Sequence, residues 1–239
     1  MLAAAAVCPC PPILVPEVAA GAAPELDAAR NACLDALGVL AAAKPDLLIV
    51  AGPAGPDGRG PFPPGSAGSF AGFGVDLTVR LGEAQGGSPA PGRPLPASLA
   101  VGAWLLDRAG WGGAPVEGLG VGEPLAADRC LRAGDDLAAR ARRVALLVMG
   151  DGSACRTVKA PGYLDERAAD FDAAAARALG SADVAALSAL DESLAYELKA
   201  AGRAPWQVLA GAAQGAGLGG QLLYEDAPYG VGYVVAAWS

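Results

Sequence analysis

Histidine is missing from all 239 residues of this chain. Imidazole is the side chain that most often serves as a general base, proton shuttle or metal ligand near neutral pH. The absence excludes a Ser-His-Asp triad, a Cys-His dyad, a histidine-bound zinc, and an iron site of two histidines and one carboxylate. Any chemistry of this protein has to proceed without imidazole.

The chain also lacks long apolar runs, basic clusters and a cysteine framework. No apolar stretch reaches the ~18 residues of a membrane-spanning helix. Lys+Arg number 17 against 25 Asp+Glu, a net charge of −8, so neither nucleic acid nor an anionic membrane is an expected partner. The 5 cysteines are an odd number, and residues 1–7 are apolar without a basic start, which argues against a secretory leader and disulfides. We expect a cytoplasmic protein.

What the chain does contain is typical of a packed globular domain. Hydrophobic residues make up 53% and charged residues 18%, which excludes intrinsic disorder. A chain of this length can bury a hydrophobic core large enough to fold without stabilising disulfides or metal ions. Because no linker-like segment divides it, we expect residues 1–239 to form one domain.

Hydrophobic periodicity predicts strands that alternate with helices. Strands are expected at residues 2–7, 46–52, 74–81, 116–121, 144–150, 221–224 and 232–238, helices at 24–43, 96–109, 124–142, 164–179, 184–200 and 205–213, and loops at 52–69 and 83–93. The first strand, helix and strand form a βαβ unit, which predicts parallel pairing. The fold class is therefore α/β: a three-layer domain whose central, mostly parallel or mixed sheet has helices on both faces.

Ligands of such sheets bind beyond the carboxyl ends of the strands, and two groups of candidate metal ligands fall there. Cys8 and Cys10 follow the first strand. Two thiolates could hold a soft metal ion if further ligands converged, or the two residues could be small and simply buried. Glu225 and Asp226, near the last strands, could be carboxylate ligands or could form an exposed turn before Pro228.

Other candidates follow the strand at residues 144–150. Asp151 and Ser153 belong to a Gly-Asp-Gly-Ser turn, which could bind an anion, supply a base or ligand from Asp151, or be an Asx-type turn. Ser153 has no histidine to activate it as a nucleophile. Lys159 and Tyr163 lie just beyond, with Asp165 and Arg167, and could bind an acidic small molecule; the alternative is a set of solvated loop charges.

Four segments resemble the B-subunit-like family of class III extradiol dioxygenases, and most closely its alanine-rich actinobacterial branch. The segments are VCPCPPILVPE (residues 7–17), VMGDGSACRTVKAPGYLDERAADFD (148–172), AGRAPWQVLAGAA (201–213) and YEDAPYGVGYVVAAW (224–238). The resemblance spans nearly the whole chain and implies a single α/β domain. Active members of the family are similar to ring-cleaving enzymes that hold non-haem Fe(II) with two histidines and a glutamate, and use a further histidine as acid/base.

The positions that the resemblance assigns to the family's histidines carry no histidine in this chain. The first ligand histidine, in the pattern CPHPP, falls on Cys10, and the acid/base histidine of the pattern G-D-x-S-H falls on Ala154. The second ligand histidine has no counterpart in residues 52–69, and the carboxylate ligand falls on Glu225 or Asp226. Loss of a positioned acid/base group typically lowers the rate ~100- to 10,000-fold. The resemblance thus implies a catalytically silent or altered relative with a binding or regulatory role, no expected cofactor, and a small-molecule ligand near Asp151 and Lys159.

Two alternatives stay open at this point. A rebuilt site of Cys10 and a carboxylate could hold iron, zinc or copper and support a metal-dependent oxidoreductase of the ring-cleaving type, since relatives of this fold use a cysteine in the metal site. A different activity could also use Cys10, Asp151, Ser153 or Glu225, and fast alkylation of Cys10 at neutral pH would favour it. A homo-oligomer is left open, and the residues name no substrate.

Overall fold

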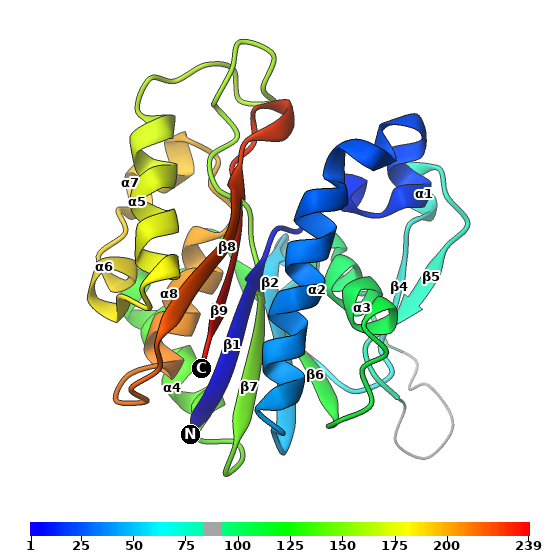
Figure 1. Ribbon diagram of the computed structural model, residues 1–239, viewed down its shortest axis with the longest axis vertical. Coiled ribbons are helices and arrows are strands. Elements are labelled where there is room, and N and C mark those ends of the chain that lie inside the picture. Colours follow the sequence, from blue (N-terminus) through cyan, green and yellow to red (C-terminus); the bar gives the residue numbers. More distant parts are fainter. Residues whose placement is uncertain (84–91) are drawn as a thin grey trace.

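A computed structural model describes residues 1–83 and 92–239, and its centre is a seven-stranded sheet (Figure 1). The strand order is β3-β6-β2-β7-β1-β9-β8. The strands are β1 (Leu2–Cys8), β2 (Leu47–Ala54), β3 (Gly60–Phe62), β6 (Val116–Gly122), β7 (Val144–Met149), β8 (Gly220–Asp226) and β9 (Tyr233–Trp238). Two further strands, β4 (Ala67–Ser69) and β5 (Thr78–Arg80), form a separate small sheet.

The sheet is mixed, as expected. β7 pairs in parallel with β1 and β2, and β2 pairs in parallel with β6. β9 runs antiparallel to β1 and β8, and β3 runs antiparallel to β6. The first two strands are parallel, but the expectation that they pair directly was wrong. β7 lies between them, because all six of its residues are apolar and are buried on both faces of the sheet.

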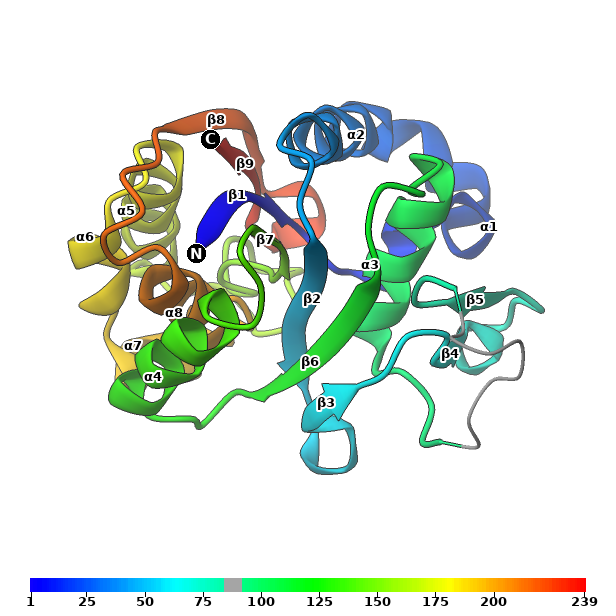
Figure 2. The same cartoon turned by 90° about the horizontal axis from the view of Figure 1, so that it is seen from below.

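Helices cover both faces of this sheet, which confirms the three-layer α/β architecture (Figure 2). One face carries α2 (Asp27–Ala42) and α3 (Ala97–Arg108), and the short α1 (Pro16–Ala19) precedes α2. The other face carries α4 (Ala127–Ala138), α5 (Ala168–Gly180), α6 (Val184–Ser188), α7 (Glu192–Glu197) and α8 (Arg203–Ala212). The buried apolar side chains accordingly divide into two cores, one under α2 and α3 and one under α4 to α8.

The predicted apolar stripe of the first long helix is confirmed. Its members are all buried against the sheet: Leu26, Ala29, Cys33, Leu37 and Leu40. The helix begins later than residue 24, because Ala20–Leu26 forms a 3-10 helix that contains Pro24. Gly134 of α4 also has a packing reason: a Cβ there would lie 2.0 Å from the carbonyl oxygen of Val208, so the glycine lets α8 approach closely.

The single helix expected at residues 184–200 was wrong. Two short helices, α6 and α7, occupy this stretch. Asp191 accepts a hydrogen bond at 2.8 Å from the backbone N–H of Leu194 and so begins a new helix. Aspartate side chains that bond nearby backbone groups compete with continuous helix in this way.

Two other expectations also needed correction. Residues 52–69 are not one loop, because β2 continues to Ala54 and the stretch contributes β3 and β4. Residues 74–81 contain only the three-residue β5, since Gly74 takes a left-handed conformation that ends a 3-10 turn. Of the expected loop at 83–93, residues 84–91 lie outside the described residues. In the part of the chain that the structure describes, no helix combines the length and apolar character needed to span a membrane.

Candidate functional site

The carboxyl ends of β1, β7 and β8 and the start of β9 lie at one edge of the sheet, and strand register selects which side chains meet there. Asp226, the last residue of β8, pairs with Tyr233, the first of β9. Tyr224 precedes Asp226 by two residues and pairs with Val235, which belongs to the core under α2. Opposite and alternate residues point to the same face. Tyr224, Asp226 and Tyr233 therefore lie on the α2 face.

Cys10 and Asp151 meet at the same edge, just beyond β1 and β7. The backbone N–H of Cys10 donates to Oδ1 of Asp151 at 2.8 Å, and the Cys10 thiol lies 3.7 Å from Oδ2 of the same carboxylate. Burial raises the pKa of the Cys10 thiol well above its usual range, and the neighbouring Asp151 charge raises it further. The thiol is therefore neutral at pH 7, bonded to a carboxylate rather than presented as a thiolate.

Asp151 is a largely buried carboxylate at this edge of the sheet. Burial raises its pKa to about 6 despite the opposing hydrogen bonds from Cys10. Part of the residue nevertheless stays open to solvent. In the described part of the chain, Asp151 is in none of the ion pairs. Among the described residues, the only side-chain or backbone donors to this carboxylate come from one neutral residue, Cys10.

Two tyrosines lie at the same ends of β8 and β9, on the α2 face. Tyr233 is 2% exposed, and its pKa is raised by burial first and then by the charges of Asp151 and Cys10. The Tyr224 hydroxyl donates to Asp226 Oδ2 at 3.4 Å. We call Cys10, Asp151, Tyr224, Asp226 and Tyr233 the strand-end cluster.

A hydrogen bond joins two distant segments at the same end of the sheet. The hydroxyl of Tyr229, the third tyrosine, lies in the turn between β8 and β9 and donates to Oε2 of Glu25 at 2.7 Å. Figure 1 shows this turn and the segment before α2 at the end of the sheet where β1 terminates. Tyr229 has a φ of 59°, which is unusual for a residue other than glycine. The bond connects the turn between β8 and β9 to the segment before α2.

Ser153 does not join Asp151. Its backbone N–H and its hydroxyl donate to the two oxygens of Asp172 of α5, at 2.7 and 2.8 Å. Arg156 adds an ion pair with Asp172 at 3.1 Å. A Cβ on Gly232 would lie 2.4 Å from Asp172 Oδ2, so the cluster requires a glycine, which has no side chain, at this position. The cluster lies on the face covered by α5, so Ser153 and Asp151, two residues apart, have separate hydrogen-bond partners.

The residues proposed as metal ligands also separate. Glu225 pairs with Val234, which belongs to the core under α4 to α8, so Glu225 points to the face opposite Asp226. Within the described residues, no three His, Cys, Asp or Glu side chains are grouped so that they could hold a metal ion. Cys8, the other candidate thiol, is fully buried, and its pKa is raised by a hydrogen bond with Cys33 and by burial. All five cysteines are free.

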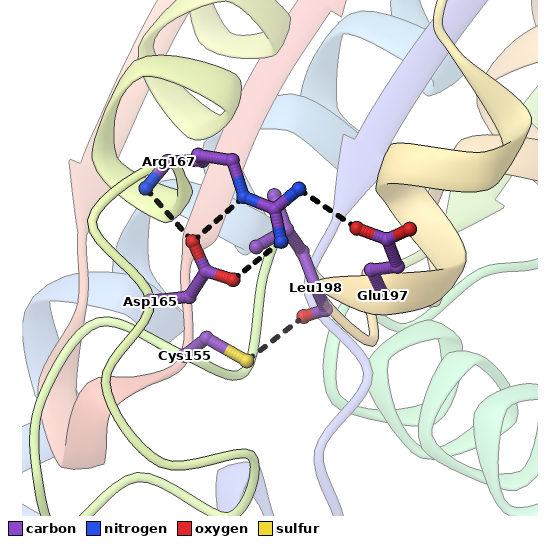
Figure 3. Close-up of polar contacts among 5 residues, drawn as sticks. All are labelled: Cys155, Asp165, Arg167, Glu197 and Leu198. Carbon is purple, nitrogen blue, oxygen red and sulfur yellow. Dashed lines mark hydrogen bonds and ion pairs between the residues drawn. The ribbon is translucent and has the colours of Figure 1, made fainter.

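The candidate residues of the loop after the Ser153 cluster are exposed. Lys159 is exposed and its backbone N–H donates to Thr157 Oγ1 at 3.3 Å, and the Tyr163 side chain is 64% exposed. Arg167 forms ion pairs at 2.7 Å with both Asp165 and Glu197, and lowers the pKa of Asp165 to about 2 (Figure 3). In the same view the Cys155 thiol donates to the Leu198 carbonyl. Arg167 thus pairs with Asp165 and Glu197 rather than with Asp151.

Ala154 occupies the position to which the resemblance assigns the acid/base histidine. Its backbone N–H donates to the Leu198 carbonyl at 2.9 Å, and its methyl group cannot carry a proton. Sequence reasoning missed Tyr233, Glu25 and Asp172. Tyr233 could have been found from strand register, because it is the first residue of the last strand. The partners of Glu25 and Asp172 lie in loops, and hydrophobic periodicity does not predict the path of a loop.

A separate cavity lies away from the strand ends. Its volume is about 1230 Å³, and it lies along the outer side of α3 against β5. Trp104, Trp111, Arg80 and Arg108 line it. None of the candidate site residues is among its lining residues, so it is separate from the strand-end cluster.

Comparisons with known proteins add a fold relative. No family model matches the chain, and no curated protein is similar to it. Among solved structures it is similar to an uncharacterized protein, JW3007, from Escherichia coli K12, with 15% identity over 98% of each chain and a TM-score of 0.59. At this identity the likeness shows a shared fold and nothing of function.

Proposed function

We propose that this protein is a non-catalytic relative of the B-subunit-like class III extradiol dioxygenases, with a binding or regulatory role. It would bind a small molecule at the strand-end cluster. The observation that carries the proposal is the contact between Cys10 and Asp151. Cys10 takes the place that the resemblance gives to a ligand histidine, and both its N–H and its thiol point at a carboxylate of the protein itself.

The residues present do not fit Fe(II) of the ring-cleaving kind. Such a site needs two neutral nitrogen donors and a carboxylate, with positions left open for substrate and oxygen. The sequence has no histidine, so both nitrogen donors are missing, and Cys10 offers a sulfur in place of one of them. Ala154 offers no group to move a proton. We therefore derive no step through a metal ion.

Metal content and ring cleavage test this proposal. The protein, purified without a histidine tag, is loaded anaerobically with Fe(II), Zn(II) or Cu(I), freed of excess ion, and measured by inductively coupled plasma mass spectrometry and with catechol under air. We expect far less than one ion per chain and no ring-cleaved product.

The outcome that overturns the proposal is near-stoichiometric metal with catechol turnover, both lost in Cys10→Ala. Cys130→Ala is the matched control, because it removes another buried thiol, which bonds to the carbonyl of Leu125 in the α4 region. Metal retained equally by both variants would indicate adventitious binding and would leave the proposal standing.

A further inference from the structure

We infer that the cavity of about 1230 Å³ beside α3 binds an extended peptide, which adds a strand to the free edge of β5 and places a bulky apolar side chain against Trp104. This site is separate from the strand-end cluster, and the inference does not depend on the proposed function. It comes from the backbone groups of β5, the aromatic wall of the cavity and the charges around it.

The first observation is the direction of the backbone groups of β5. On the side of β4, the carbonyl of Leu77 accepts a hydrogen bond and the N–H of Leu81 donates one, both at 2.9 Å. Bonded and non-bonded positions alternate along an antiparallel pair of strands. The residues at the alternate positions of β5 are Thr78 and Arg80, so their N–H and C=O groups point away from β4.

The two outer edges of this small sheet differ. On β4, the carbonyl of Ala67 accepts a hydrogen bond from the N–H of Leu95 at 2.8 Å, so the chain itself covers that edge. Among the described residues, none forms a hydrogen bond with the backbone of Thr78 or Arg80 at the outer edge of β5. Residues of β5 line the cavity and residues of β4 do not. An open strand edge at a cavity is suited to the addition of a peptide strand.

The second observation is the apolar wall that an added strand would meet. Figure 2 shows the small sheet beside α3. Val79 of β5 is 7% exposed and belongs to the core under α2 and α3. Alternate side chains of a strand added to β5 would point to the same side as Val79. Trp104 of α3 lines the cavity and is 6% exposed, so it offers a ring that is held in place by packing.

The end of α3 fixes a second tryptophan, Trp111, in the cavity wall. Gly110 takes a left-handed conformation with a φ of 64°, and the N–H of Trp111 donates to the carbonyl of Leu106 at 2.9 Å, a common ending for a helix. The indole N–H of Trp111 donates to the carbonyl of Ala114 at 3.1 Å. The polar atom of this ring is therefore satisfied, and an apolar side chain is the group that fits against it.

The third observation is charge. Three exposed carboxylates line the cavity: Glu17, Glu83 and Asp107. Within the described residues none of them forms an ion pair. The two guanidiniums of the lining have other contacts, since that of Arg108 lies 5.9 Å from the centre of the Trp104 ring and that of Arg80 donates to the carbonyl of Gly65 at 3.4 Å. The balance is negative, which favours basic residues at the ends of the peptide.

The probe is the fluorescein-labelled heptapeptide Lys-Val-Thr-Phe-Thr-Val-Lys, in which both Val and the Phe share one face of a strand. Fluorescence anisotropy measures its binding. We expect one-to-one saturable binding, ~10-fold or more tighter than that of the peptide with Ala in place of Phe. Glu in place of both Lys should weaken binding ~3-fold or more at low salt.

Methyl groups on the peptide nitrogens test the strand pairing. One peptide is methylated on the nitrogen of Phe, and the other on the nitrogen of the Thr that follows it. Neighbouring N–H groups of a strand point to opposite edges. Only one of the two peptides should therefore lose affinity, by ~3-fold or more, because only one has lost a hydrogen bond to β5.

Three variants assign the binding to this cavity. Gly112 lines it, and a Cβ there would meet no atom within 4 Å, so Gly112→Phe should obstruct the cavity without strain and weaken binding ~10-fold or more. Gly55→Phe makes the same change at another exposed glycine with free space around it, and should bind as the original protein does. Thr78→Pro removes an outward N–H from an edge strand, where proline is tolerated, and should weaken binding ~3-fold or more.

Absence of saturable binding, an equal response to the two methyl groups, or unchanged affinity in Gly112→Phe would overturn the inference. Binding of acetyl-phenylalanine amide as tight as that of the heptapeptide would also overturn it, because the cavity would then take a small molecule. None of these measurements involves a metal ion, catechol or Cys10. Failure here is therefore distinguishable from failure of the proposed function.

Discussion

Two aspartates near the end of β7 lie on opposite faces of the sheet and differ in their partners. Asp172 receives a backbone N–H, a hydroxyl and a guanidinium, all from within the chain. Among the described residues, Asp151 receives only the two donors of Cys10 and no cation. Asp172 thus has donors for both of its oxygens and holds α5 to the turn after β7. Asp151 keeps hydrogen-bond acceptor capacity that the described residues do not use. The difference separates a carboxylate with a full set of partners from one that is buried with few of them.

The largest expected effect concerns Asp172. Asp172→Ala leaves the backbone N–H and the hydroxyl of the fully buried Ser153 without their acceptor, and each unsatisfied buried donor typically lowers the free energy of unfolding by ~1–3 kcal/mol. Urea denaturation at neutral pH measures it. Asp170→Ala on the exposed side of α5 is the control and should change the value by less than ~0.5 kcal/mol. A loss below ~1 kcal/mol for Asp172→Ala would remove the contrast between the two carboxylates.

A smaller effect is expected in the pH dependence of stability. Because the pKa of Asp151 is raised to about 6 in the folded protein, the folded state binds more protons than the unfolded state between ~pH 4 and 6. This contribution is fully present below ~pH 4 and is lost as pH rises through ~6. Cys10 and Tyr233, the titratable groups that face Asp151, stay neutral in this window because both of their pKa values are raised.

Asp151→Asn should therefore flatten this part of the stability profile. Between ~pH 4 and 7, the free energy of unfolding of the variant should rise by roughly 1–2 kcal/mol relative to the original protein. This is less than the ~1.4 kcal/mol for each pKa unit, because Asp151 keeps solvent contact. Urea denaturation at successive pH values measures the difference. Parallel profiles for the two proteins would contradict the assignment of an uncompensated charge to Asp151.

The smallest effect concerns the reactivity of Cys10. A buried, protonated thiol reacts slowly, so iodoacetamide at ~pH 7.5 should label Cys10 ~10-fold or more slower than free cysteine. Asp151→Asn should raise the rate by a factor of only ~2–5, since burial is the larger cause of the raised pKa. Peptide mass spectrometry resolves the five cysteines. Fast labelling of Cys10 would instead favour the different activity that the sequence left open.

The layers of the fold were predictable because they depend on apolar periodicity. The stripe from Leu26 to Leu40 and the wholly apolar β7 follow from residue spacing alone. The position of β7 between β1 and β2 was not predictable, since pairing partners depend on the whole set of strands. The break between α6 and α7 could have been found from Asp191, a residue type that favours the start of a helix.

The candidate site was only partly predictable. Strand ends located Cys10 and Asp151 at one edge, because parallel neighbours end together. The separation of Asp151 from Ser153, two residues away, depends on the turn taken by Gly152, whose N–H donates to the Gly232 carbonyl. The choice between Glu225 and Asp226 needed the pairing register, which a bulge between Leu222 and Tyr224 shifts by one residue. Such irregularities leave no periodic signal in the sequence.

The position of β1 in the sheet has a consequence for synthesis on the ribosome. The strand is apolar throughout, and both of its neighbours come from far along the chain, β7 at Val144–Met149 and β9 at Tyr233–Trp238. At ~5–20 residues per second, β1 waits ~12–46 s after its own emergence before β9 can cover its second edge. During that interval the nascent chain exposes an unpaired apolar strand edge, which can associate with other chains. We therefore expect ribosome-associated chaperones to bind it.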